Sequence, residues 1–561
     1  AMPFSYENYV ASRQGCRLVL TLDATVQACL EKQMQSAIDR YDVQNGAFGL
    51  VMNVKTGEIL AMATLGSYDP NNYLEIYDTD TREALESMKQ SYLSLPEGSE
   101  GYERGRAAYE SALSAARLKQ WRNRCLSDGY EPGSTFKVLT MAAALDCGAI
   151  DLNTGFHCSG AEQIPGRSQL LHCWRSQGHG SQHTAQALQN SCNLAFAHIA
   201  LKLGGERFYE YVQRFGVLEK TGVDLIGESK GIFFDRELVV NTDKWGTASL
   251  TSGSFGQTFK VTPIQLISAV SAAVNGGDLY KPYLVEKVIS ADGSIVEEYE
   301  PTLVRQVISE ATSETVCQIL ETVVSDGSGR TAAVPGYKIG GKTGTSEKLD
   351  QLSKEGEVEA YVSSFLAVAP AEDPQIVILL LLDEAQMENP YGSVVAAPVV
   401  GAMLADILPY MGIEPNYTES ELTAMSGKVK DVNGQLVHDA MTVLRLQGYS
   451  VTIVGEGATV VAQSPEAGSQ LTAGGTITLY TDESLIPKEI EVPDVAGMSV
   501  TEVNNAIIGA GLKLKLIGVS ESATDQVAYS QTPAAGESVM PGTIIEVTFT
   551  INSGEEENGE G

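Results

Sequence analysis

The stretch Tyr130-Glu-Pro-Gly-Ser-Thr-Phe-Lys137 combines a serine with a lysine three positions later. Its Pro-Gly pair stands just before an apolar helical pattern, which places Ser134 in the first turn of a helix. Because side chains at i and i+3 share a helix face, the amine of Lys137 can reach the hydroxyl of Ser134. A serine hydroxyl needs a neighbouring base to act as a nucleophile, and a buried lysine that has lost its proton can be that base. A helix N-cap serine with a surface lysine is the alternative interpretation.

Two shorter motifs follow along the chain, and each carries groups suited to the same chemistry. Ser191-Cys192-Asn193 connects two helical patterns, and its hydroxyl and amide can relay a proton and hold a substrate amide. Alone, it is far more typical of a turn serine followed by a cap asparagine. Lys342-Thr-Gly-Thr345 follows two glycines, which indicate close backbone approach. A lysine and two hydroxyls there can bind a carboxylate while backbone N–H groups polarise a neighbouring carbonyl.

The order of these motifs, SxxK, then SxN, then KTG, resembles that of the penicillin-interacting serine acyl-transferases. The surrounding sequence, from about Arg17 to Leu408, is similar to the transpeptidase domain of class B penicillin-binding proteins. The segments that carry this resemblance are Leu20-Thr-Leu-Asp23, Gly57-Glu-Ile-Leu-Ala-Met62, Tyr130–Lys137, Phe255-Gly-Gln257, Val261-Thr-Pro263, Ser363-Ser-Phe365 and Ala369-Pro370. The resemblance implies a mixed α+β, serine β-lactamase-like fold with an antiparallel sheet and a helical subdomain.

The resemblance also implies catalytic roles for the first two motifs. Ser134 would be the acylated nucleophile and Lys137 its general base. Ser191 and Asn193 would line the opposite wall of the site, with Ser191 helping to protonate the leaving D-alanine.

The third motif would bind the end of the substrate. Lys342 and the hydroxyls of Thr343 and Thr345, on either side of Gly344, would hold the terminal carboxylate of the peptide. The oxyanion hole would be formed by the backbone N–H groups of Ser134 and Thr345.

The implied reaction cross-links peptidoglycan stem peptides in two steps. The serine attacks a D-Ala-D-Ala amide, D-alanine leaves, and an amine of a neighbouring stem peptide resolves the acyl-enzyme. A β-lactam antibiotic mimics the first step and stays attached. The resemblance requires no metal or cofactor. The alternatives are a D,D-carboxypeptidase or β-lactamase-type hydrolase, and a non-catalytic protein that binds muropeptide or β-lactam.

Two C-terminal segments repeat one pattern, which identifies them as related modules. The first contains Val429-Lys-Asp-Val-Asn-Gly434 and Gln463-Ser-Pro-Glu-Ala-Gly468, and the second contains Val492-Pro-Asp-Val-Ala-Gly497 and Gln531-Thr-Pro-Ala-Ala-Gly536. Each pattern also includes one helix and alternating strands. Both modules resemble the PASTA domain, although the first has lysine where the pattern has proline. Two such units are typical of the Gram-positive division and sporulation types of the family.

The family resemblance and the repeats together imply six segments, and the family leads us to expect that a membrane anchor has been removed ahead of the first. They are a remnant of an N-terminal pedestal (1–16), the transpeptidase domain (17–412), a linker (413–424), two PASTA domains (425–484 and 485–552) and a disordered tail (553–561). The family implies a location on the extracytoplasmic face of the cell membrane. Because class B proteins lack a glycosyltransferase domain, a membrane glycosyltransferase is an expected partner.

The composition excludes some classes of partner. The chain has 561 residues, of which 43% are hydrophobic, and its 38 basic and 71 acidic residues give a net charge of −33. Nucleic-acid binding depends on cationic side chains and counterion release, so a nucleic-acid partner is excluded. The same charge argues against docking on an anionic membrane surface. The longest apolar run, Ile376–Leu382, is too short to span a membrane and suits a buried strand.

Cysteines and histidines gather between the first two motifs, as His157-Cys158, His172-Cys173, His179 and His183. Their spacing is not a recognised zinc pattern, so no metal site is predicted. Because the family works outside the cytoplasm, a disulfide or redox-controlled pair between Cys158 and Cys173 is one interpretation, and free buried thiols are the other. Cys192 can border the pocket or simply pack in the core. Trp174 is expected to shape the substrate groove, with a core or packing role as the alternative.

The remaining patterns predict local elements of the larger domain. Residues 47–54 and 57–64 form a hairpin, 262–276 a helix, and 361–369 and 376–382 a second strand pair. Residues 73–122 are rich in charged residues and alanine and predict helices separated by a loop near 96–101. This segment is longer than its family counterpart, and we interpret it as a solvated helical insertion or a partner surface.

Overall fold

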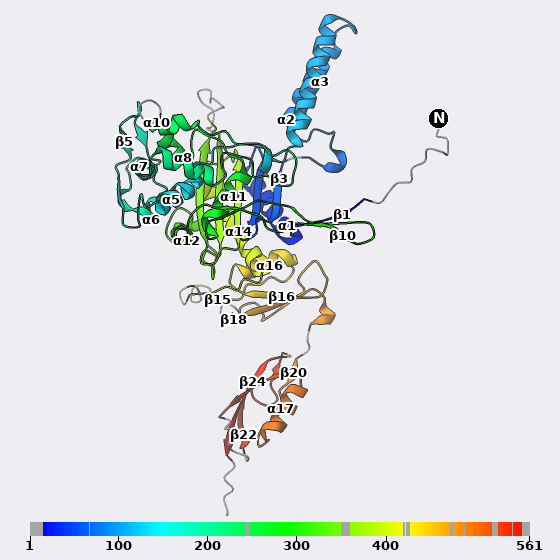
Figure 1. Cartoon of the computed structure of the whole chain (residues 1–561). Coiled ribbons are helices and arrows are strands. Elements are labelled where there is room, and N and C mark those ends of the chain that lie inside the picture. The colour runs from blue at the N-terminus through cyan, green and yellow to red at the C-terminus, as the bar shows by residue number, and fades with distance from the viewer. Residues whose placement is uncertain are drawn as a thin grey trace, which may run out of the picture. The chain divides into compact units, whose positions relative to one another are not determined.

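The computed structural model describes residues 15–66, 68–241, 246–348, 360–418, 421, 427–471, 475–486, 489–518, 526–540 and 542–551. The chain divides into two compact units, Ala1–Tyr417 and Thr418–Gly561, and each is described by itself (Figure 1). The predicted tail 553–561 and all but the last two residues of the predicted pedestal remnant lie outside the described residues.

The larger unit is built on a five-stranded antiparallel sheet, as the sequence predicts. Both predicted strand pairs belong to it, since β2 pairs with β3 and β13 pairs with β14. The strands lie in the order β12 (Gly340–Glu347), β13 (Tyr361–Ala369), β14 (Ile376–Asp383), β2 (Ala47–Asn53) and β3 (Ile59–Leu65). The strand that carries the third motif, β12, is therefore at an edge of the sheet, where one side remains open to another element.

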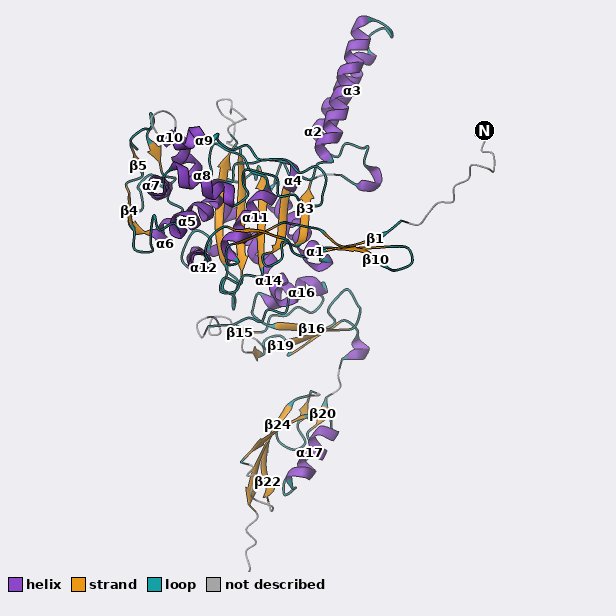
Figure 2. Ribbon diagram, in the orientation of Figure 1, coloured by secondary structure: helices purple, strands orange, loops and turns teal. Residues whose placement is uncertain are grey.

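Helices cover both faces of this sheet (Figure 2). Val377, Leu379 and Leu381 of β14 join one hydrophobic core, while the alternate residues of the strand join the other. This explains the continuous apolar run, because successive side chains of a strand point to opposite faces. One core includes α5 (Lys137–Asp146), α11 (Pro263–Val274) and α12 (Glu310–Ser325), and the other includes α1 (Ala24–Tyr41) and α14 (Ala397–Tyr410).

A helical subdomain extends from the first of these cores and carries the second motif. Its helices are α6 (Thr184–Gln189), α7 (Asn193–Leu203), α8 (Gly205–Arg214), α9 (Arg236–Val240) and α10 (Gly246–Ser254). Two small two-stranded sheets accompany them, one of β4 (Gly155–Cys158) with β7 (Gly180–His183) and one of β5 (Ala161–Glu162) with β6 (Leu171–His172).

The segment 73–122 forms a helical hairpin that projects from the larger unit (Figure 1). Helix α2 (Thr79–Leu93) begins at an Asp78 cap and α3 (Glu100–Gln120) at a Ser99 cap. The helices approach closely at Gly105, where a Cβ would lie 2.6 Å from the Cβ of Tyr92. Leu85 is the buried residue of α2, and α3 has none, so the predicted helices are present and mostly exposed. The role of this segment, as a solvated insertion or a partner surface, stays a prediction.

Each C-terminal module packs one helix against a three-stranded sheet. The two repeated motifs of each module contact each other through a glutamine. In the first module, the Gln463 side chain accepts a hydrogen bond from the Val432 N–H (2.8 Å) and donates one to the Lys430 carbonyl (3.1 Å). Gln531 bonds the Val495 N–H and the carbonyl of Pro493 in the same way. The glutamine side chains contact only the backbone carbonyl of the second residue in each opening motif, Lys430 in the first module and Pro493 in the second. Lysine can therefore replace proline at this position in the first module.

The elements of the modules are α16 (Val437–Arg445) with β15 (Gly427–Lys428), β16 (Ser450–Val454), β17 (Ala462–Ser464), β18 (Gln470–Leu471) and β19 (Thr476–Tyr480), and α17 (Val500–Gly509) with β20 (Ile490–Glu491), β21 (Lys513–Ile517), β22 (Gln526–Thr532), β23 (Ser538–Val539) and β24 (Ile544–Ile551). The remaining elements of the larger unit are β1 (Arg17–Leu20), β8 (Asp278–Tyr280), β9 (Val285–Ile289), β10 (Ile295–Glu298), β11 (Leu303–Gln306), α4 (Arg124–Ser127), α13 (Gly392–Val395), and the 3₁₀ turns η2 (Pro70–Asn72), η3 (Gly133–Phe136) and η4 (Arg330–Ala332); η5 (Glu483–Leu485) lies in the smaller unit.

Among the described residues, one helical stretch, Gly392–Tyr410, has the length and apolar composition to cross a membrane. Most of it is buried, and its Val400, Met403 and Leu404 belong to the core that covers the sheet. It therefore serves as a core helix of this fold.

Candidate active site

The first motif lies in η3 and the first turn of α5. The Nζ atom of Lys137 is 3.0 Å from the Oγ atom of Ser134, as the i, i+3 spacing predicts. Gly133 has a positive φ of 53°, and a Cβ there would lie 2.7 Å from the Oγ atom of Ser346 on β12. Glycine is therefore needed before Ser134, both for its backbone conformation and for the approach of η3 to the sheet edge.

Lys137 is fully buried and joins the first two motifs. Its Nζ atom lies 2.8 Å from the Ser191 carbonyl oxygen, 3.2 Å from the Ser191 hydroxyl and 2.8 Å from the Oδ1 atom of Asn193. The rings of Phe196 and Phe255 lie 5.4 and 5.8 Å away. Burial lowers the pKa of Lys137 from 10.5 to about 7, because the charged ammonium loses its hydration.

The hydroxyl of Ser191 lies between two lysines. Besides its contact with Lys137, it accepts a hydrogen bond from the Nζ atom of Lys342 at 2.9 Å. Ser191 has a φ of 50°, a conformation that few non-glycine residues adopt. Lys342 is also fully buried, and desolvation together with the charge of Lys137 lowers its pKa well below the usual value. The structure thus brings the three motifs together at one point.

The rest of the third motif continues along β12. The Thr343 hydroxyl lies 3.3 Å from the Oγ atom of Ser328, and the Thr345 hydroxyl accepts a hydrogen bond from the Gly392 N–H at 3.1 Å. A Cβ on Gly344 would lie 3.0 Å from the methyl carbon of Thr135 in η3, so this glycine allows the edge strand to approach the nucleophile turn.

Three residues of the site were not predicted as such. Phe196 follows Asn193 by three positions on α7, and Phe255 lies in a segment that carries the family resemblance, so both had a weak signal in the sequence. Ser328 follows α12 with no motif around it, and only the tertiary structure brings it to Thr343.

The predicted oxyanion donors lie on adjacent backbones. A Cβ on Gly133 would be 3.1 Å from the carbonyl oxygen of Thr345, so the turn that holds Ser134 runs beside the strand that holds Thr345. Trp174 is not a core residue, because 64% of its surface is exposed. Its indole N–H donates to the Asn190 carbonyl (3.0 Å), and its ring packs against His179. Its role in the substrate groove stays a prediction.

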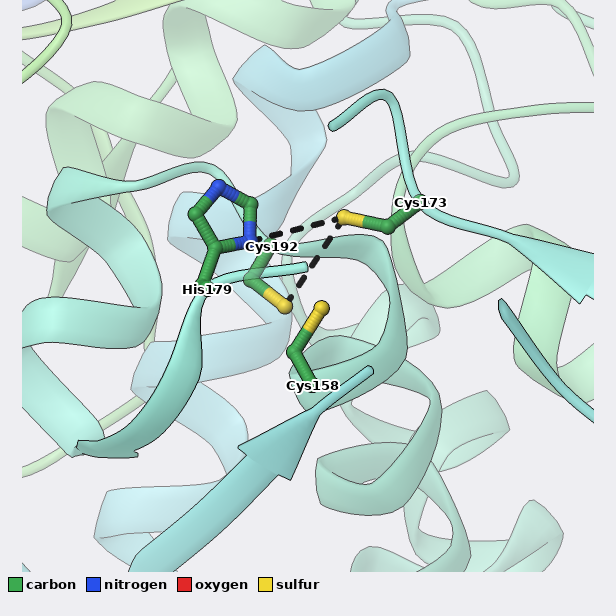
Figure 3. Close-up of side chains that lie close together, drawn as sticks. All are labelled: Cys158, Cys173, His179 and Cys192. Atoms are coloured by element: carbon green, nitrogen blue, oxygen red, sulfur yellow. Dashed lines mark hydrogen bonds between the residues drawn. The ribbon is translucent and has the colours of Figure 1, made fainter. Parts of the chain in front are cut away.

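The predicted cysteine pair is not a disulfide in the structure, because all eight cysteines are free thiols. Cys158 and Cys173 lie instead in one cluster with His179 and Cys192 (Figure 3). Of the residues that the sequence grouped there, the fold keeps His179 beside the pair and adds Cys192, which the sequence had placed only in the second motif. Hydrogen bonding with Cys192 lowers the pKa of Cys173, and desolvation lowers the pKa of His179. The other three predicted histidines, His157, His172 and His183, are exposed.

No carboxylate of the described residues hydrogen-bonds to the side chains of the motif lysines, Ser191 or Asn193. Their partners are hydroxyl, carbonyl and amide oxygens and the lysine amines.

Comparisons with known proteins identify the domain families of this chain. The family model described as the penicillin binding protein transpeptidase domain matches residues 47–405. The PASTA domain model matches residues 427–483 and 490–551.

Similar proteins come from both spore-forming and other bacteria. Stage V sporulation protein D of Bacillus subtilis is 34% identical over 86% of this chain and 68% of its own length. Peptidoglycan D,D-transpeptidase FtsI of Escherichia coli is 28% identical over 72% of this chain and 58% of its own length. The structure of penicillin binding protein 3 from Mycobacterium tuberculosis in complex with aztreonam is 26% identical with a TM-score of 0.58, covering 73% of this chain and 82% of that one. Most of the curated relatives are thus considerably longer than the segment they share with this chain.

Proposed function

This chain belongs to the penicillin-binding protein transpeptidase family, and from that premise we propose that it is a serine-type peptidoglycan D,D-transpeptidase. It acts in cell-wall synthesis during division or sporulation, and β-lactams acylate and inhibit it. Its substrates are stem peptides that end in D-Ala-D-Ala. The observation that carries the proposal is the contact of Ser134 with a fully buried lysine whose pKa is about 7.

Lys137 is oriented to accept the proton of Ser134. The Ser191 carbonyl and the Asn193 Oδ1 can only accept hydrogen bonds, and both lie 2.8 Å from the Lys137 nitrogen. A neutral amine has two N–H donors, so these two acceptors use both of them. Its lone pair then faces the hydroxyls, of which Ser134 is the nearer at 3.0 Å. Neutral Lys137 is therefore set up as the general base for acylation.

In the acylation step, the Ser134 oxygen attacks the carbonyl carbon of the penultimate D-alanine and its proton passes to Lys137. Backbone N–H groups of Ser134 and Thr345 stabilise the oxyanion. The C–N bond then breaks, and the leaving D-alanine takes a proton through Ser191, which contacts both lysines. In the second step, an amine of another stem peptide attacks the ester, forms the cross-link and releases Ser134.

Substrate binding rests on the third motif. The terminal carboxylate of the peptide is held by the hydroxyls of Thr343 and Thr345, with Lys342 behind them. The Thr345 hydroxyl receives the Gly392 N–H as a donor, so its own proton remains available to the carboxylate. These contacts orient the scissile amide over Ser134.

A hydrolase is the second candidate from the sequence. A fast β-lactamase needs a deacylating water positioned by a carboxylate, and no carboxylate in the described part of the chain bonds to the catalytic lysine. We therefore favour the transpeptidase over a fast β-lactamase, and the product analysis described below separates the transpeptidase from a carboxypeptidase. We further propose that the protein works at the extracytoplasmic face of the cell membrane, together with a glycosyltransferase partner that supplies the glycan strands.

Mass spectrometry after incubation with benzylpenicillin tests the proposal. We expect the intact drug mass on the peptide that contains Ser134, no adduct in Ser134→Ala, and a normal adduct in Ser87→Ala, an exposed serine of α2. A D-Ala-D-Ala pentapeptide supplied with an amine acceptor should give more aminolysis than hydrolysis product. An adduct on another residue would contradict the assignment of the nucleophile, and hydrolysis alone would favour the carboxypeptidase.

A further inference from the structure

Three thiols and one imidazole converge beside the second motif, and the proposed mechanism uses none of them. Cys158 ends β4, Cys173 follows β6, His179 precedes β7 and Cys192 caps α7. Their ligand atoms all lie within 4.8 Å of one another. Figure 3 shows the three sulfur atoms and the ring nitrogen of His179 turned toward a common centre. The three cysteines are at most 6% exposed.

The distances in this cluster suit a metal ion better than a disulfide. A tetrahedral zinc ion with bonds of about 2.3 Å to sulfur and about 2.0–2.1 Å to nitrogen gives sulfur–sulfur edges of about 3.8 Å and sulfur–nitrogen edges of about 3.6 Å. The Sγ atoms of Cys173 and Cys192 are 3.9 Å apart, and Cys173 Sγ is 3.6 Å from Nδ1 of His179. A disulfide would use two of the three thiols and leave the third thiol and the imidazole unexplained.

The donor set also selects the kind of metal. Thiolates and a neutral imidazole in a Cys₃His arrangement favour Zn²⁺ in a closed, four-coordinate structural site, whereas Mg²⁺ and Ca²⁺ prefer oxygen ligands. We propose that Cys158, Cys173, His179 and Cys192 bind one Zn²⁺ ion. The zinc replaces the thiol protons of the three cysteines, which are released to solvent, and no electrons are exchanged.

The position of Cys192 links this site to the catalytic groups. Cys192 stands between Ser191 and Asn193, whose carbonyl and amide oxygens hold Lys137. Zinc therefore ties the two small sheets to the N-terminus of α7 and supports the φ of 50° at Ser191. The ion is too enclosed by protein ligands to act on substrate, so its role is to position this wall of the site. This part of the inference rests on the proposed function, whereas the metal site itself does not.

The test measures metal content before activity. The full chain, reduced and incubated with zinc and then desalted, should retain about one Zn²⁺ per molecule by elemental analysis. Loaded with Co²⁺ instead, it should show the visible absorption of tetrahedral cobalt with thiolate charge-transfer bands. His179→Ala and Cys158→Ser should lose both signals. The controls His157→Ala, an exposed histidine of β4, and Cys317→Ser, a buried cysteine of α12, should keep them.

Native mass spectrometry of the unmodified chain keeps the proposal testable if a ligand variant does not fold. Substoichiometric zinc in the wild type, unchanged binding in His179→Ala, or recovery of a disulfide from the metal-incubated protein would each overturn the site. For the positioning role, removal of zinc by a chelator should slow penicillin acylation by about 10- to 100-fold, since small displacements of catalytic groups have effects of this size. Zinc should restore the rate. Metal binding with no effect on acylation would refute the positioning role alone, and failure of acylation in metal-loaded protein would instead count against the proposed function.

Discussion

The rate of Ser134 acylation should rise with pH through about 7, because Lys137 must be neutral to accept the proton. Burial lowers the pKa of Lys137 from 10.5 to about 7. At pH 7 roughly half of the protein then has the neutral amine, whereas an ordinary lysine would be neutral in roughly 0.03% of molecules. The fold thus raises the population of the active base by roughly a thousandfold. Below the pKa the rate should fall about tenfold for each pH unit, and above it the rate should level off.

The assay is stopped-flow acylation by a chromophoric cephalosporin, with the second-order rate constant measured from about pH 5 to about pH 9, a range that spans the lowered pKa. Lys137→Met should lower this rate constant by about 10²- to 10⁴-fold, the usual contribution of a general base. Lys202→Met, which removes an exposed lysine of α7, should leave the rate and its pH dependence unchanged. Circular dichroism at each pH checks that the fold persists. A rate that is flat across this range, or that is still rising at its alkaline end, would refute the assignment of Lys137 as the neutral base.

Three substitutions test other parts of the structure. Gly344→Ala places a methyl group against the Ser364 hydroxyl and the η3 turn that contains Ser134, so acylation should slow by about 10- to 100-fold with the fold retained. An unchanged rate would show that β12 can move aside. Gln531→Ala leaves the Val495 N–H and the Pro493 carbonyl of the second module without their partner, and should destabilise that module by about 1–3 kcal/mol. Hydrogen exchange should increase in the second module and not in the first. Gly105→Val should separate α2 from α3 at Tyr92 and increase exchange in the hairpin at unchanged acylation; slower acylation would instead connect this hairpin to catalysis.

Much of the fold could be predicted because it depends on local patterns. The apolar, β-rich stretch 47–54 and the apolar run 376–382 predict strands, and both belong to the central sheet. The Thr262-Pro263 start predicts a helix, and Thr262 forms a capping box at the N-terminus of α11. The repeated motifs predict two modules of one type, whose shared glutamine contact became visible only in three dimensions.

The chemistry of the site likewise depends in part on sequence spacing and in part on tertiary packing. Sequence spacing by itself determined that Lys137 faces Ser134, because residues three apart on a helix are neighbours. It could not determine that Lys342 would reach Ser191 from the edge of the sheet, or that two phenylalanines and the surrounding core would desolvate Lys137. Nor could it join Cys192, known only as the middle residue of a catalytic motif, to Cys158, Cys173 and His179. Proximity across the fold and the loss of hydration on burial arise only from tertiary packing, and these lower the pKa of Lys137 and bring three cysteines and His179 close together.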